Sequence, residues 1–212
     1  MKRIRLRKNY MLLLILSAGS LLSMVGVDGI TWKLAKNSNG IKVYTSKLKN
    51  SRIKAFKVTT RVKAEASDYI KALTDFPNYW RWLANCETAS LISQPTPNEY
   101  IYYVRWRAPW PMSYRDAVVR MVMEEVSDTE IVCTLQNVKG HKKVEKNIVR
   151  LPHLNGHWKF ISTPEGQLYI ENYLHMDPGG AVPSWLVNTM LIDGPFNTIV
   201  QLKKFVHHSS QE

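Results

Sequence analysis

Residues 177–188 read DPGGAVPSWLVN and separate a strand-like region from a helix-like one. Pro178-Gly179-Gly180 predicts a tight turn, because glycine readily adopts positive φ. Pro183 stands where a helix can begin, since its missing N–H is not needed in the first turn. Apolar residues then recur at steps of three and four, the period of one helix face: Trp185, Thr189, Ile192, Phe196 and Ile199. We therefore expect a long C-terminal helix, kinked at Pro195.

The ninety residues before this turn are rich in Val, Ile, Tyr and Thr and are broken by short turns, which is typical of strands. Connections this short predict antiparallel neighbours. The expected strands are Cys86–Ser93, Tyr100–Arg107, Ala117–Glu125, Glu130–Val138, Lys146–Leu151, His157–Ser162 and Leu168–Met176.

The first part of the domain adds three strands and a helix. Asn39-Gly40 predicts a hairpin turn, and Ser67-Asp68 predicts a helix start, in a helix that Pro77 interrupts. One side of this helix carries Tyr69, Ile70, Leu73, Trp80 and Leu83. The expected strands are Thr31–Ala35, Ile41–Ser46 and Ile53–Val62. This order predicts an α+β domain whose last helix lies on a curved antiparallel sheet.

Two neighbouring strands carry large apolar side chains on one face. Val119, Met121 and Met123 lie on one face of one strand, whose other face is mixed, and Tyr102 and Trp106 lie on one face of the other strand. Methionine and aromatic side chains build a wide, adaptable apolar interior. Periodicity does not distinguish a filled core from a hollow one, so both interpretations stay open.

Positive charge is concentrated at the N-terminus of this 212-residue chain of net charge +12. Residues 2–8 are strongly basic and residues 11–27 carry no charge, the pattern of a signal peptide. We expect residues 1–28 to be a cleaved signal peptide or a membrane anchor through residues 11–27, and the protein to be exported, periplasmic or secreted. The alternative is an apolar tail that stays in the cytosol.

A second basic cluster, Lys139 to Lys146, comes without any nucleic-acid-binding motif. Its charge favours transient contact with an anionic membrane surface, and nucleic acid is not an expected partner.

Three motifs resemble segments of the START domain family, the proteins related to the steroidogenic acute regulatory protein. Residues 108–116, APWPMSYRD, are similar to its P-W-P-x-S-x-R-D segment, and residues 177–188 to its junction between last strand and C-terminal helix. Residues 40–44, GIKVY, resemble an early strand of the family. The motifs follow the family's order, and residues 30–208 are accordingly expected to form one START lipid-binding domain.

The resemblance implies a helix-grip fold, in which a curved antiparallel β-sheet wraps around a long C-terminal α-helix and leaves an internal cavity. It implies non-enzymatic binding and transfer of one sterol, phospholipid or fatty-acyl ligand, with no cofactor. The alternative is a cavity enzyme of the polyketide cyclase or hydrolase kind on the same fold. The expected ligand-binding residues are Tyr102, Trp106, Met121, Met123, Trp158, Trp185 and Met190.

Several charged residues near these motifs are candidates for a structural or a ligand-binding role. Arg115 and Asp116 are expected to form a structural charge pair or to cap a turn, and a role as ligand groups is the less favoured alternative. Arg105 and Arg107 either meet a phosphate headgroup or face solvent on the outer side of the sheet. Some sterol-binding members carry a buried ion pair at positions that correspond here to Tyr102 and Met121, so a sterol anchor of that kind is missing.

No motif for a catalytic nucleophile or a metal centre is present. His153 and His157 are four residues apart, but Pro152 disfavours a regular helix there, so no metal site is expected. Cys86 and Cys133 could pair in an oxidising compartment, although two buried free thiols are the favoured interpretation.

Overall fold

The computed structural model describes residues 30–49, 51, 53–180, 182, 186–187 and 189–209. Its described strands form one ten-stranded sheet in the order β1-β2-β3-β10-β9-β7-β6-β5-β4, with β8 paired to β6 off this path. The strands are β1 (Lys33–Ser38), β2 (Ile41–Lys47), β3 (Lys54–Val62), β4 (Cys86–Thr96), β5 (Glu99–Trp106), β6 (Tyr114–Ser127), β7 (Glu130–Asn137), β8 (Ile148–Arg150), β9 (His153–Ser162) and β10 (Leu168–Asp177).

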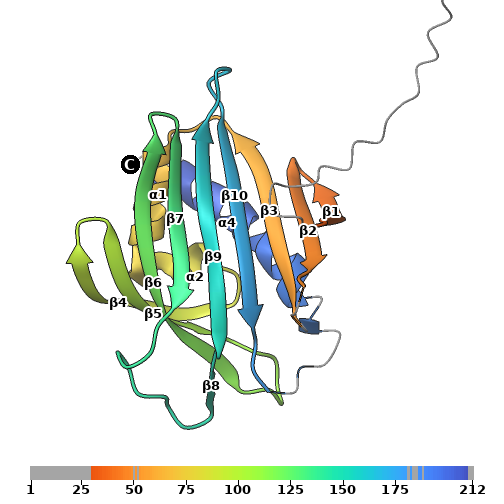
Figure 1. Ribbon diagram of the computed structural model, residues 1–212, viewed down its shortest axis with the longest axis vertical. Coiled ribbons are helices and arrows are strands. Elements are labelled where there is room, and N and C mark those ends of the chain that lie inside the picture. Colours follow the sequence, from red (N-terminus) through yellow and green to blue (C-terminus); the bar gives the residue numbers. More distant parts are fainter. Residues whose placement is uncertain are drawn as a thin grey trace, which may run out of the picture.

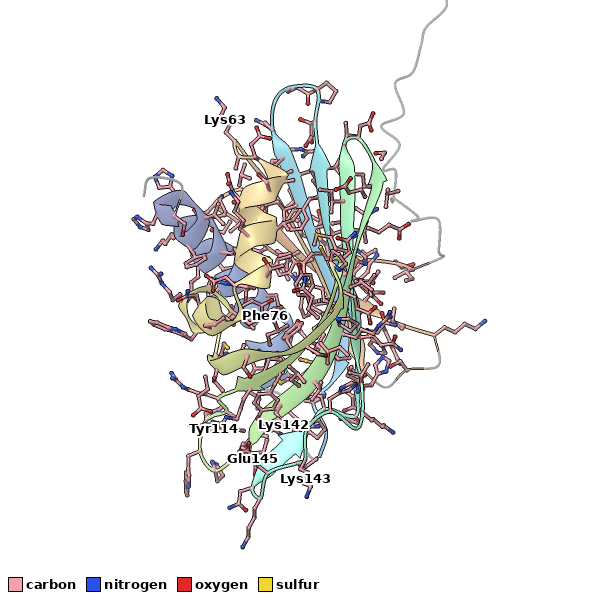
Figure 2. All side chains as sticks on the ribbon, turned by 90° about the vertical axis from the view of Figure 1, so that its left-hand side faces the viewer. Lys63, Phe76, Tyr114, Lys142, Lys143 and Glu145 are labelled. Atoms are coloured by element: carbon pink, nitrogen blue, oxygen red, sulfur yellow. The ribbon has the colours of Figure 1, made fainter. Side chains whose placement is uncertain are left out.

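The helices cover one face of this sheet, as Figure 1 shows. They are α1 (Ala66–Thr74), the 3₁₀ turn η1 (Phe76–Asn78), α2 (Tyr79–Trp82), the π-helical segment η2 (Thr189–Asp193) and α4 (Gly194–Ser209). Helix α4 packs against α1 and α2 and against strands β2 and β3. In the view turned by 90°, Phe76 lies between the helices and the sheet (Figure 2). The predicted helix-grip architecture is confirmed.

Alternation along the strands divides the sheet into two faces. Ile170 and Phe160 on the inner face are fully buried under the helices. On the outer face of β5 and β6 a small separate cluster forms from Ile101, Tyr103 and Val118. Lys142, in the loop before β8, lies over the Tyr103 ring at 4.6 Å, so this loop covers part of the outer face.

Both predicted turns are confirmed. Asn39 and Gly40 have φ of 52° and 71° and join Ser38 to its partner Ile41 in the β1–β2 hairpin. Gly179 and Gly180 both have φ of 66° at the end of β10. A Cβ on Gly179 would lie 3.0 Å from the Val149 side chain, so space as well as backbone conformation favours glycine there.

The C-terminal helix differs in detail from the expectation. Pro183 and Trp185 lie outside the described residues. A π-helical segment ends at Asp193, and α4 begins at Gly194 with Pro195 in its first turn. Proline has no N–H to donate to the preceding turn, so the irregularity falls immediately before Pro195 rather than within a continuous α-helix.

The segment expected as strand Lys146–Leu151 is a three-residue strand that pairs with β6 in parallel, not antiparallel. The side chains of Asp116 and Arg150 join the two strands, with Nε–Oδ1 at 2.6 Å and Nη2–Oδ2 at 2.9 Å. The Leu151 N–H also donates to the Asp116 carbonyl oxygen at 2.9 Å. The direction of β8 follows from the topology, because β8 runs almost directly into β9, and β9 runs parallel to β6 since both are antiparallel to β7.

The break at Pro77 is confirmed, but it changes which residues face the core. Tyr79 and Trp82 of α2 are buried, whereas Trp80 is 61% exposed. The 3₁₀ turn between α1 and α2 resets the helical phase, so the apolar face of α1 does not continue into α2.

The two cysteines are buried free thiols on β4 and β7. Burial raises the pKa of Cys86 and of Cys133 to about 12 in each case. Because the thiolate is the reactive form, we expect neither to be alkylated by iodoacetamide at pH 8 in the folded protein, and both to react in urea. Rapid labelling of the native protein, seen by mass spectrometry, would contradict this.

Within the described part of the chain, no helix has both the length and the apolar character needed to cross a membrane. The expected signal peptide or anchor, residues 1–28, lies outside the described residues.

Candidate ligand cavity

A cavity of about 530 Å³ lies between the inner face of the sheet, α2 and the start of α4. Strands β5, β6, β9 and β10 supply most of the sheet residues that line it, and Leu186, Met190 and Pro195 close the helix side. The residues that line it are predominantly apolar. The sequence alone did not decide whether the interior is filled or hollow. Between these strands and the helices it is hollow.

Five of the seven expected binding residues lie on the cavity wall: Tyr102, Trp106, Met121, Trp158 and Met190. Trp185 lies outside the described residues.

Met123 is not among the lining residues, which corrects the expectation for this position. It lies on the same face of β6 as Met121, but the cavity does not extend that far along the strand. Met123 packs instead against the filled part of the core.

The aromatic wall is organised by ring contacts. Trp82 meets Trp158 edge-on with ring centroids 6.3 Å apart, and Tyr79 meets Trp82 at 4.6 Å. The Tyr79 hydroxyl donates to the Leu73 carbonyl oxygen at 2.5 Å. The indole Nε1 of Trp82 is buried and has no hydrogen-bond partner among the described residues.

Arg115 is the most unusual residue of the wall, because it is a buried arginine with 6% of its surface exposed. Its Nη1 donates to the Ser113 carbonyl oxygen at 2.6 Å, and its Nε contacts the Pro178 carbonyl oxygen at 3.4 Å. No carboxylate of the described residues forms an ion pair with it. Burial lowers the pKa of the Arg115 guanidinium from its usual value, and no neighbouring charge opposes that shift.

The expected Arg115–Asp116 charge pair is wrong, because adjacent residues of a strand point to opposite faces. Asp116 is fully buried on the other side of β6 and pairs with Arg150. Arg115 and Asp116 therefore have separate roles, one at the cavity and one in fixing β8.

The other two arginines also divide between the faces. Arg105 forms ion pairs with Glu87 and Glu145 on the outer side, so it does not reach the cavity. Arg107 lines the cavity. Strand β5 ends at Trp106, so Arg107 lies outside the strand and the alternation of strand residues does not predict which face its side chain takes.

No histidine is among the described residues that line the cavity. His175 lies on β10 with its Nε2 3.0 Å from the Ser51 hydroxyl, and its ring contacts that of His153. His157 pairs with Glu171 at 3.0 Å. Within the described ranges, no group of three or more His, Cys, Asp or Glu residues could hold a metal ion.

The model of the START domain family matches residues 17–212. The chain belongs to the START domain family. An uncharacterized protein of Pseudomonas aeruginosa is 31% identical to this START protein over 172 residues, 81% of this chain and 85% of the relative. Bovine phosphatidylcholine transfer protein is 22% identical over 183 residues, 84% of this chain and 85% of the relative.

Solved structures agree with this assignment. A STAR-related lipid transfer protein from Xanthomonas axonopodis is 31% identical, with a TM-score of 0.76 over 83% of this START protein and 98% of that chain. Human START domain-containing protein 10, at 20% identity, shares the fold with a TM-score of 0.75 over 85% of this chain and 74% of that one.

Proposed function

We propose that this START domain binds one lipid in its cavity and transfers it between membranes without chemical change. The observation that carries the proposal is the apolar cavity of about 530 Å³. This volume falls within the range of about 300–1,000 Å³ typical of ligand pockets. Burying each methylene of an acyl chain in such a site is favourable by about 0.8 kcal/mol. The names of the bovine and Xanthomonas relatives support lipid transfer as the biological outcome.

A direct test is native mass spectrometry of the protein purified without detergent. We expect a non-covalent adduct of lipid mass, recovered unchanged by solvent extraction, and transfer of a fluorescent lipid from donor to acceptor vesicles. A protein that stays empty with every lipid class offered, and that moves none between vesicles, would contradict the proposal.

A cavity enzyme of the cyclase kind would need a general acid or base at the ligand. The described lining residues include no histidine, aspartate or glutamate, but Tyr79, Tyr102 and Tyr114 line the cavity and tyrosine can transfer a proton. Recovery of a chemically altered ligand in the mass spectrometry would favour the enzyme, and recovery of an unchanged lipid the carrier.

The exposed side chain of Trp110 supports membrane docking near the cavity. It is 91% exposed in the β5–β6 connection, directly after cavity residues Ala108 and Pro109. Tryptophan partitions favourably into the membrane interface.

We expect Trp110→Ala to weaken binding to anionic vesicles several-fold and to slow transfer, while ligand binding in solution is retained. Sedimentation with vesicles measures this. Val126→Ala is the matched control, because Val126 is 53% exposed at the other end of β6. Equal vesicle binding by wild type and Trp110→Ala would rule out this docking site.

Export through residues 1–28 is part of the same proposal, since the basic block and uncharged run have the pattern of a signal peptide. N-terminal sequencing of the protein from its native cell would detect the expected cleavage.

A further inference from the structure

The charged side chains that line the cavity are all positive, and they are hydrogen-bond donors. Its described lining contains two arginines, Arg107 and Arg115, and no acidic residue. An apolar ligand would offer a buried guanidinium neither a negative charge nor a hydrogen-bond acceptor. Taking an unpaired ion out of water is costly, and proteins avoid it by pairing the charge.

Arg115 has donors to spare. A guanidinium carries five N–H groups in a planar fork that fits a carboxylate or a phosphate. Here one strong hydrogen bond goes to the Ser113 carbonyl oxygen, and the contact with Pro178 is long at 3.4 Å. Among the described residues Nη2 has no acceptor. Both acceptors are neutral carbonyl oxygens, so they orient the guanidinium without neutralising it.

The two carbonyl oxygens that hold Arg115 belong to the β5–β6 connection and to the turn after β10. Tyr114, the neighbouring cavity residue, lies towards the lower end of the molecule in Figure 2, near Lys142, Lys143 and Glu145. The charged end of the cavity is thus the end where β6 begins. Met121 lies six residues along β6, about 20 Å at the rise of an antiparallel strand, in the apolar part.

We propose that the cavity selects an amphiphile with an anionic headgroup, a carboxylate or a phosphate, bound to Arg115 while its apolar chain extends along β6 towards Met121. This inference rests on the lipid-binding function proposed above and names the ligand class. A sterol or other neutral lipid would leave the guanidinium of Arg115 unpaired in a low-dielectric site.

The test compares lipids that differ only in charge. Delipidated protein is titrated with palmitate and methyl palmitate, with dipalmitoyl phosphatidate and dipalmitoylglycerol, and with inorganic phosphate, by displacement of a bound neutral fluorescent lipid. For the wild type we expect at least about a tenfold preference for the anionic member of at least one pair, in keeping with a charge-assisted hydrogen bond. The pair with the larger ratio identifies the headgroup.

Arg115→Gln should reduce that preference to about twofold or less and leave the affinity for the neutral member unchanged, which also shows that the variant is folded. Arg115→Lys should keep part of the preference. Arg120→Gln is the matched control, because it removes an arginine of the same strand that does not line the cavity and pairs with Glu99 instead. We expect it to retain most of the preference.

Equal affinities within both pairs for the wild type would overturn the inference, even if Arg115→Gln failed to fold. So would a preference that survives Arg115→Gln, or complete displacement by inorganic phosphate alone. Failure of the lipid-binding function itself would look different, because then neither the charged nor the neutral member of either pair would displace the probe.

Discussion

Replacing Asp116 with asparagine should lower the free energy of unfolding by about 3 kcal/mol. Removing one partner of a buried ion pair typically costs about 3–5 kcal/mol, because the other charge stays in a poorly solvated place. Asp116 is fully buried, but the side chain of its partner Arg150 is 20% exposed, so we expect the lower end of this range. Urea unfolding followed by tryptophan fluorescence measures the change.

The matched control is Glu130→Gln. Glu130 pairs with Lys159 at 2.8 Å, and the two side chains are 26% and 32% exposed. Pairs open to solvent contribute about 0–1 kcal/mol, so this variant should unfold close to the wild type. If Asp116→Asn lost no more stability than Glu130→Gln, the ion pair would not be what holds β8 to β6.

Loss of the Asp116–Arg150 ion pair should also change the shape of the cavity. Asp116 accepts the Leu151 N–H through its backbone and holds Arg150 through its side chain, and Leu151 lines the cavity. Arg115, the residue before it, points to the other face and lines the cavity too. Two adjacent residues of one motif therefore join the stability of the sheet to the shape of the ligand site.

Local sequence patterns were sufficient for most of the architecture. The hairpin at Asn39-Gly40, the break at Pro77 and the turn at Gly179-Gly180 each depend on backbone preferences of the residues themselves, so they could be predicted. The antiparallel order follows from short connections. The parallel pairing of β8 could not be predicted from local patterns, because it depends on which strand lies between β6 and β9 in the sheet: β7 is antiparallel to both, so β9 and the short β8 that leads into it run parallel to β6.

The cavity residues were predictable only where alternation holds. Tyr102 and Met121 lie within regular strands and were placed on the inner face. Trp82 was missed because α2 has four residues, too few for a helical period to show. The opposite directions of Arg115 and Asp116 follow from strand alternation and could have been deduced. Whether the interior is hollow depends on how far α4 and α2 stand from the sheet, which periodicity does not record.

Filling the cavity should abolish lipid binding without unfolding the protein. Val119 is buried in the middle of β6 and lines the cavity. Val119→Trp would project a large ring towards the cavity from a residue that also packs in the core, so overpacking should cost about 1–3 kcal/mol while the ring fills part of the ligand space. Tryptophan is also well accepted in strands. We expect lipid binding and vesicle transfer to fall at least about tenfold, since the lost methylene burial is worth about 0.8 kcal/mol for each group displaced.

The comparison that isolates the cavity uses a second position on the same strand. Val126→Trp adds the same ring at a residue that is 53% exposed, outside the cavity. It should bind and transfer lipid like the wild type. The thermal midpoint of Val119→Trp, measured alongside, shows that the variant is still folded. A folded Val119→Trp protein that still carries lipid at the wild-type level would place the ligand outside this cavity, and the carrier mechanism argued from it would have to be given up.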